Sequence, residues 1–143
     1  MIKNNVIKKI LRIILGLGML YIGVGHLTFS RIEFQAQVPM WLAKEKNLID
    51  FVVITSGIIE ILLGVLMSWG GKFKANVGFA LAIFYILIFP GNISQYINEI
   101  DAFGLNTPNK RLTRLLFQPL LIIWALWSTE GLHFFKKVKN SVK

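Results

Sequence analysis

Four long apolar stretches constrain this chain more than any other feature of its sequence. They run from about Val6 to Phe29, Asp50 to Trp69, Ala75 to Tyr96 and Leu112 to Leu132. A helix needs about 20 residues to cross the hydrocarbon core of a bilayer, and each stretch is about that long. The expected fold class is therefore all-α, an integral membrane four-helix bundle that forms a single domain over residues 1–143.

The composition supports this fold class and excludes several functions. Hydrophobic residues make up 55% of the chain and charged residues 16%, and the mean hydropathy is +0.61, far from a typical soluble domain. The net charge of +9 comes from basic residues beside the apolar stretches, which favours a membrane surface over nucleic acid as the partner. The absence of cysteine excludes disulfides and thiol chemistry within this chain.

Basic residues predict the orientation of the bundle, because loops rich in Lys and Arg usually face the cytoplasm. Three segments on one side of the predicted bundle carry this excess. They are the N-terminus, the second connection and the C-terminus, with Lys3, Lys8, Lys9, Arg12, Lys72, Lys74, Lys136, Lys137, Lys139 and Lys143. Both termini are therefore expected in the cytoplasm, and the protein is expected as a multi-pass protein of a bacterial inner or plasma membrane.

Two segments need a separate interpretation. The N-terminus resembles a signal peptide in its charge and hydropathy, but no Ala-x-Ala-like cleavage site follows, so a retained helix is favoured. In the first outer connection, the segment VPMWLAKEKN is expected either as a short helix in the membrane interface, with Trp41 and Leu42 in contact with lipid, or as an ordered loop. Either form would allow the segment to act as a lid.

The first two apolar stretches each place one ionisable residue on a stripe of small residues. Spacings of three and four bring residues onto one helix face. The two stripes are Gly16, Met19, Gly23 and His26, and Gly57, Glu60, Gly64 and Met67. Because small residues let membrane helices approach closely, these two helices are expected to pack on their stripes, with His26 as the preferred partner of Glu60.

The third and fourth stretches carry polar residues next to prolines. The two stripes are Gly78, Ala82, Tyr85, Phe89 and Asn92, and Arg111, Arg114, Gln118, Ile122 and Ala125. Pro90 is expected to interrupt the third helix just before Asn92, and Pro119 to disturb the fourth beside Gln118. At 1.5 Å per residue, the polar side chains fall in the outer half of the bilayer, which predicts a polar pocket open to the outer face.

Each polar residue also has a structural interpretation. Asn92 and Gln118 could simply bond neighbouring helices, and His26 could reach the outer interface. Glu60 lies too deep to reach water easily, and ionisable residues inside a span usually mark a pathway, a relay or a ligand site. A purely structural tie between Glu60 and His26 stays open at this point.

Five short motifs resemble, in their order and spacing, the DoxX-like family of small four-span membrane proteins. They are GVGHLTF with His26, VPMWL, TSGIIEILLG with Glu60, IFPGNISQY with Asn92, and RLLFQPLLIIWALW with Gln118. The resemblance implies a four-helix membrane bundle. It also implies a similarity to the small membrane subunit of an archaeal thiosulfate:quinone oxidoreductase and a redox association. Without cysteine, any thiol-based step would belong to a partner protein.

The first functional hypothesis is a redox-associated membrane subunit, catalytic or accessory, that binds a quinone or a similar amphiphile. Glu60 and His26 are the candidate catalytic residues, which would exchange protons with the ligand. The candidate ligand-binding residues are Asn92, Gln118, Tyr85 and Arg114, of which Arg114 would attract an anionic substrate to the mouth of the pocket. One histidine and one glutamate are too few to predict a haem or metal site.

Two other classes of function are kept. A small proton-coupled transporter would use the buried carboxylate, although four spans are few for a transporter and a homodimer would be needed to enlarge it. A non-catalytic assembly factor of a membrane complex would use the polar residues only to fix helix packing. No nucleophile–base arrangement and no glycine-rich phosphate loop points to a hydrolase or a nucleotide-binding protein.

Overall fold

The computed structural model describes residues 2–142, and within them the chain folds only into helices and their connections. The helices are α1 (Ile2–Leu27), α2 (Arg31–Gln37), α3 (Lys46–Trp69), α4 (Lys74–Ile97), α5 (Pro108–Ser128) and α6 (Leu132–Ser141). Lys143, one residue of the predicted basic C-terminus, lies outside the described residues.

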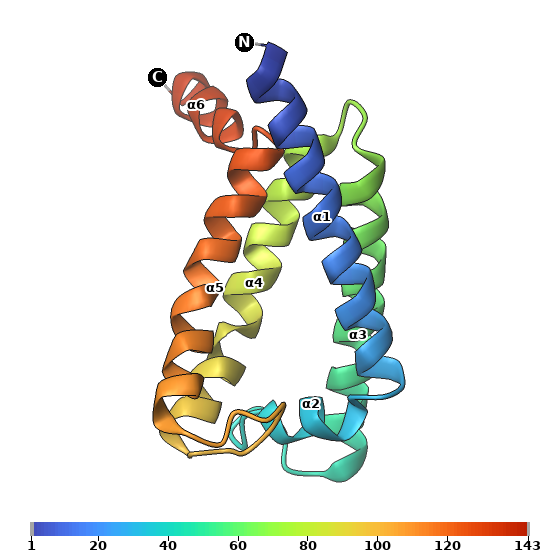
Figure 1. Ribbon diagram of the computed structural model, residues 1–143, viewed down its shortest axis with the longest axis vertical. Coiled ribbons are helices and arrows are strands. Elements are labelled where there is room, and N and C mark those ends of the chain that lie inside the picture. Colours follow the sequence, from blue (N-terminus) through green and yellow to red (C-terminus); the bar gives the residue numbers. More distant parts are fainter. Residues whose placement is uncertain (1, 143) are drawn as a thin grey trace.

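Four of these helices form two antiparallel pairs, α1 with α3 and α4 with α5 (Figure 1). The short helix α2 crosses one end of the molecule, and the two termini and α6 lie at the other end (Figure 1). Contacts within each pair are far more extensive than contacts between the pairs. The two pairs are therefore joined to each other by few contacts.

Helices α1, α3 and α4 are each long and apolar enough to cross a membrane. The predicted fourth span corresponds to α5. This helix is long and apolar enough to cross a membrane only when it is taken together with α6, and the two helices meet at a bend of 73°. Lys110, Arg111 and Arg114 near the start of α5 reduce its apolar length. The helix begins there because the Thr107 side chain accepts a hydrogen bond from the Lys110 N–H and Pro108 occupies the first turn.

Of the two forms left open for the first outer connection, the structure has the loop, and the expected interruption of the third long helix at Pro90 is wrong. The short helix in the first connection is α2, which ends at Gln37, whereas the segment from Val38 to Glu45 has only turns and bends. Pro39 explains this, because proline disfavours helix at the preceding residue and cannot donate a backbone hydrogen bond. The prolines of the long helices do not interrupt them: Pro90 lies inside α4 and Pro119 inside α5.

The expected glycine seam between α1 and α3 is confirmed. A Cβ atom added at Gly57 would lie 2.6 Å from His26 Cβ, and one added at Gly64 would lie 2.8 Å from the Gly16 carbonyl oxygen. No real Cβ atom tolerates such distances, so the two backbones touch only because these residues are glycines. The seam fixes the register of α1 against α3, and with it the position of His26 relative to Glu60.

The seam gives a first testable prediction. Gly64→Ala is expected to lower the free energy of unfolding by about 1–3 kcal/mol, because the added methyl group overpacks the α1–α3 contact. The control is Gly18→Ala on α1, where an added Cβ would meet nothing within 4 Å. This control should be neutral or slightly stabilising, since alanine favours helix over glycine. Thermal unfolding in detergent measures both, and equal shifts for the two variants would contradict the close contact.

The end of the bundle near the termini is closed by an apolar core and polar ties. The core consists of Leu15, Met19, Met67, Leu81, Phe84, Tyr85 and Ala125. Trp124 Nε1 of α5 donates to the Leu11 carbonyl of α1 at 3.1 Å and so joins the two pairs. The buried Arg12 guanidinium of α1 donates to the Met67 carbonyl of α3, within one pair. Nearby, the Lys74 ammonium, 3.1 Å away, lowers the pKa of Glu130. The space between the pairs is therefore closed at this end.

Candidate functional site

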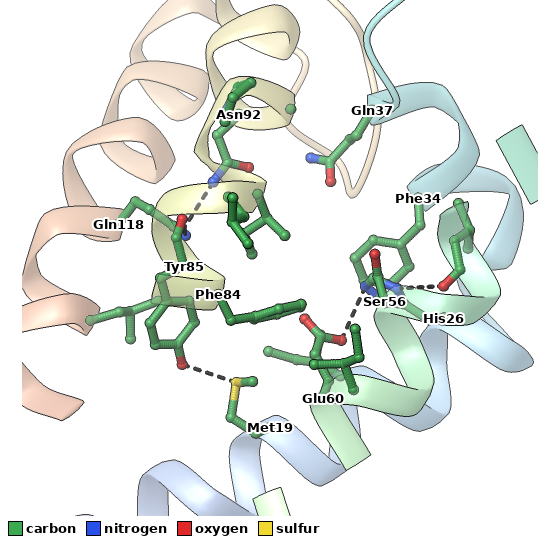
Figure 2. A pocket seen from close by; sticks show the side chains of 18 of the residues that line it. Met19, His26, Phe34, Gln37, Ser56, Glu60, Phe84, Tyr85, Asn92 and Gln118 are labelled. Atoms are coloured by element: carbon green, nitrogen blue, oxygen red, sulfur yellow. Dashed lines mark hydrogen bonds and ion pairs between the residues drawn. The ribbon is translucent and has the colours of Figure 1, made fainter. Parts of the chain in front are cut away.

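A cavity of about 650 Å³ lies between the two helix pairs, with walls from α1, α3, α4 and α5 and a roof from α2 and the residues after it. Most of its lining is aliphatic or aromatic. Polar side chains gather toward the α2 end, and Figure 2 shows several of them pointing inward. They are His26, Gln37, Ser56, Glu60, Asn92, Arg114 and Gln118.

His26 and Glu60 form the first polar group of the cavity. Their side chains approach at 3.2 Å between Nε2 and Oε2, and both are almost fully buried. This distance is that of an ion pair, but the atoms are not aligned as a hydrogen bond, and Oε2 has no hydrogen-bond partner among the described residues. Figure 2 shows the other carboxylate oxygen of Glu60 pointing into the cavity. The predicted pairing of His26 with Glu60 is confirmed.

The environment of His26 determines where protons can sit. Nδ1 lies 3.2 Å from the Val53 carbonyl oxygen, which can only accept a hydrogen bond, so Nδ1 carries a hydrogen. Nε2 therefore faces the carboxyl group, and one proton can lie on either partner: a neutral acid beside a neutral imidazole, or a carboxylate beside an imidazolium. Phe34 of α2 lies against the imidazole ring and keeps water from that side. The pair lies at the cavity wall and has the groups needed to bind one proton.

A chain of amide hydrogen bonds forms the second polar group, on α4 and α5. Gln118 Nε2 donates to the Tyr85 carbonyl at 3.0 Å, and Gln118 Oε1 accepts from Asn92 Nδ2 at 3.0 Å (Figure 2). Asn92 Oδ1 in turn accepts from Arg114 Nε at 3.2 Å. Arg114 also donates from Nη2 to Gln37 Oε1 on α2 at 3.4 Å. These bonds fix the amide groups and leave the guanidinium at the α2 end of the cavity.

Tyr85 lies at the opposite end of the polar region. Its hydroxyl donates to Met19 Sδ at 2.9 Å and its side chain is 3% exposed, so the hydroxyl is directed at the core below the cavity (Figure 2). Arg111, which shares the predicted stripe of Arg114, pairs with Asp101 at 2.7 Å and donates to the Leu105 carbonyl. The structure thus brings together His26 and Glu60 on one wall and Asn92, Gln118 and Arg114 on the other.

The roof is held by a separate set of polar contacts. Gln95 accepts from Gln37 of α2 and donates to the carbonyls of Ile100 and Ala102 at 3.3 Å. At the edge of the roof, Arg31 of α2 forms a two-point hydrogen bond with Asp50 of α3, and this bond raises the pKa of Arg31. The roof is therefore fastened to both helix pairs.

Comparison with known proteins gives one positive result. A family model described as a domain of unknown function, DUF8561, matches residues 15–129. The chain belongs to the DUF8561 family. The match extends from α1 to the end of α5 and so includes nearly the whole lining of the cavity. No curated protein and no solved structure matches the chain.

The proposed resemblance to the DoxX-like family is wrong, since the family found for this chain is DUF8561. The motifs that suggested it have a general physical origin. Small residues beside one polar residue, at helical spacing in an apolar segment, suit any compact bundle of membrane helices. The redox association implied by the resemblance is lost with it.

The sequence analysis of this DUF8561 protein missed Phe34, Gln37, Ser56 and Gln95. Gln95 follows Asn92 by three residues and is 1% exposed, so the same helical spacing that singled out Asn92 would have found it. Gln37 gave no comparable signal, because it ends a short helix whose position depends on contacts with α3 and α4. Within residues 2–142, no group of three His, Asp or Glu side chains is placed to hold a metal ion.

Proposed function

We propose that this DUF8561 protein is an integral membrane protein that binds a small amphiphile in the cavity between its helix pairs. In this proposal α1, α3, α4 and α5 cross the cell membrane and both termini face the cytoplasm. The polar end of the cavity then lies in the outer half of the bilayer. The basic residues at the terminal end support this orientation, since such residues mark cytoplasmic segments.

The cavity is the single observation that carries the proposal. A volume of about 650 Å³ lies within the range of sites that hold small molecules, roughly 300–1,000 Å³. Its wall is mainly apolar and its polar groups converge at one end, which suits a ligand with an apolar tail and a polar head. A protein in which Glu60 only tied helices together would have no need for a cavity beside it.

The outer surface of the cavity indicates how such a ligand enters. Leu87 of α4 lines the cavity and is 71% exposed, and Phe117 of α5 lines it and is 49% exposed. A side chain that lies both in the cavity wall and on the outer face of the protein marks a place where the cavity opens sideways between helices. In a bilayer these openings face acyl chains, so the tail of an amphiphile can enter from the lipid without crossing water.

Native mass spectrometry of the purified full chain tests the proposal. We expect a co-purifying amphiphile on the wild-type protein and an occupancy about tenfold lower in Ser56→Phe, whose ring would fill the cavity from α3. The matched control is Leu62→Phe, on the same helix, where the side chain is exposed and lies outside the cavity. Equal occupancy in the two variants would place the bound molecule elsewhere.

A proton-coupled carrier is the second candidate function. The observation that favours it is the His26–Glu60 pair, two titratable side chains in contact at the wall of the cavity. Coupling would require the amphiphile and the proton to move together, with Glu60 changing its protonation as the ligand binds. Liposomes that contain the protein should then take up the amphiphile only under a proton gradient, and Glu60→Ala should abolish the uptake. Binding without uptake would leave the binding role and exclude the carrier.

A further inference from the structure

We infer that the ligand of this cavity has an anionic head, a carboxylate or a phosphate, which binds the Arg114 guanidinium under the roof. This inference rests on the proposed function, because it identifies the chemical class of the molecule that the cavity takes. The observation behind it is a cationic side chain that lines the cavity and whose hydrogen bonds among the described residues go only to neutral groups, while Glu60 attracts it from beyond ion-pair distance.

The partners of Arg114 differ from those of its neighbours in the roof. Arg31 pairs with Asp50, and Arg111 pairs with Asp101 at 2.7 Å. Among the described residues, Arg114 has no carboxylate within 4.0 Å, and its hydrogen bonds go to the amide oxygens of Asn92 and Gln37. Its guanidinium also lies over the Phe103 ring, 4.8 Å from the centroid. A cation in an apolar surrounding is costly unless an anion compensates it.

The guanidinium of Arg114 supplies charged hydrogen-bond donors that are free to meet a ligand. Neutral donors are free as well, since each amide NH2 group keeps a second hydrogen and Ser56 adds a hydroxyl. The amide nitrogens of Asn92, Gln118 and Gln37 already donate to Gln118, Tyr85 and Gln95, respectively. Arg114 uses Nε and Nη2 for its two bonds, which leaves the Nη1 hydrogens without a partner among the described residues. Guanidinium N–H groups bind carboxylate and phosphate oxygens strongly because the hydrogen bonds are charge-assisted. A neutral head would meet the remaining amide hydrogens and the Ser56 hydroxyl, whose hydrogen bonds to it are weaker than charge-assisted ones.

Glu60 is compatible with an anionic ligand when the His26–Glu60 pair carries its extra proton. Glu60 and Arg114 both line the cavity but do not form an ion pair, so the head can lie between them. An ionised Glu60 would repel that head, whereas a protonated Glu60 could donate a hydrogen bond to it. Glu60→Gln, which is neutral and keeps a donor, is therefore expected to bind an anionic amphiphile at least as tightly as the wild-type chain.

The test compares three probes with the same tail: palmitate, hexadecyl phosphate and hexadecanol. Each is added to the full chain in phosphatidylcholine nanodiscs, and protein-bound molecules are counted by native mass spectrometry. We expect at least one anion to bind about tenfold more tightly than the alcohol, as a charge-assisted bond predicts. Palmitate and hexadecyl phosphate separate the two kinds of head. Arg114→Gln should remove the preference, Arg114→Lys should keep part of it, and the exposed Lys110→Gln should leave it unchanged.

The outcomes separate this inference from the proposed function. The inference of an anionic head is wrong if hexadecanol binds the wild-type chain as tightly as both anions, or if a folded Arg114→Gln variant still prefers an anion to the alcohol. In either case the proposed amphiphile site stands. If none of the three probes binds the wild-type chain and it carries no co-purifying amphiphile, both the inference and the proposed function fail. The comparison of the two anions with hexadecanol on the wild-type chain tests the inference even if Arg114→Gln does not fold.

Discussion

His26→Leu is expected to lower the free energy of unfolding by about 3 kcal/mol, because it removes one partner of a buried pair and leaves Glu60 uncompensated. Glu60→Met should also destabilise the protein, since it leaves the Nε2 atom of His26 without a partner. The double variant should be clearly more stable than the sum of the two single changes predicts. Replacing a whole buried pair with apolar side chains removes the desolvation cost along with the attraction.

A double-mutant cycle in detergent, read by reversible unfolding, measures this coupling. The matched control is the half-exposed pair formed by Lys74 and Glu130, where the same cycle should give a coupling below about 1 kcal/mol. Additive effects of His26→Leu and Glu60→Met, within about 0.5 kcal/mol, would show that the two side chains do not interact. In that case the His26–Glu60 pair could not be part of the site.

Gln95→Leu is expected to destabilise the protein by about 2 kcal/mol, with the loss concentrated in the roof. Its amide bonds Gln37 of α2 and the carbonyls of Ile100 and Ala102, so leucine would leave all three groups without that partner. The roof over Arg114 should then open more often, and a bound amphiphile should dissociate faster. Hydrogen exchange should increase in residues 98–107 and in α2, while the α1–α3 seam stays protected.

The control for this prediction is Asn98→Ala on the same end of α4. The Asn98 side chain bonds Ser94 Oγ at 3.1 Å in an exposed position, so its removal should change stability by less than about 0.5 kcal/mol. Unchanged exchange of the roof in Gln95→Leu would show that other contacts, such as the bond between Arg31 and Asp50, hold the roof closed.

The sequence predicted the parts of the site that depend on periodicity within long helices. The glycines of α1 and α3 identified the seam, and the seam placed His26 beside Glu60. The same spacing placed Asn92 and Gln118 on facing sides of α4 and α5, where they bond each other. These predictions succeeded because a stripe on a regular helix fixes which side chains share a face. The functional roles of these residues remain predictions.

The remaining parts depend on contacts between distant segments. Gln37 reaches the cavity because α2 folds across the end of the bundle, and no local pattern encodes that position. The continuity of α4 through Pro90 depends on its packing rather than on the local preference of proline, which disfavours a helix interior. The family itself was misidentified because motifs of small and polar residues recur in unrelated bundles of apolar helices.

Photocrosslinking tests most directly whether the cavity between the helix pairs is the binding site. The probe is a hexadecyl amphiphile with a diazirine in its tail, in acid and alcohol forms, and labelled residues are mapped by peptide sequencing. We predict labels on the cavity residues Phe84, Ile88 and Leu121, with their loss in Ser56→Phe. Labels confined to outward-facing residues such as Leu62 and Val65, unchanged in Ser56→Phe, would contradict a ligand site between the pairs.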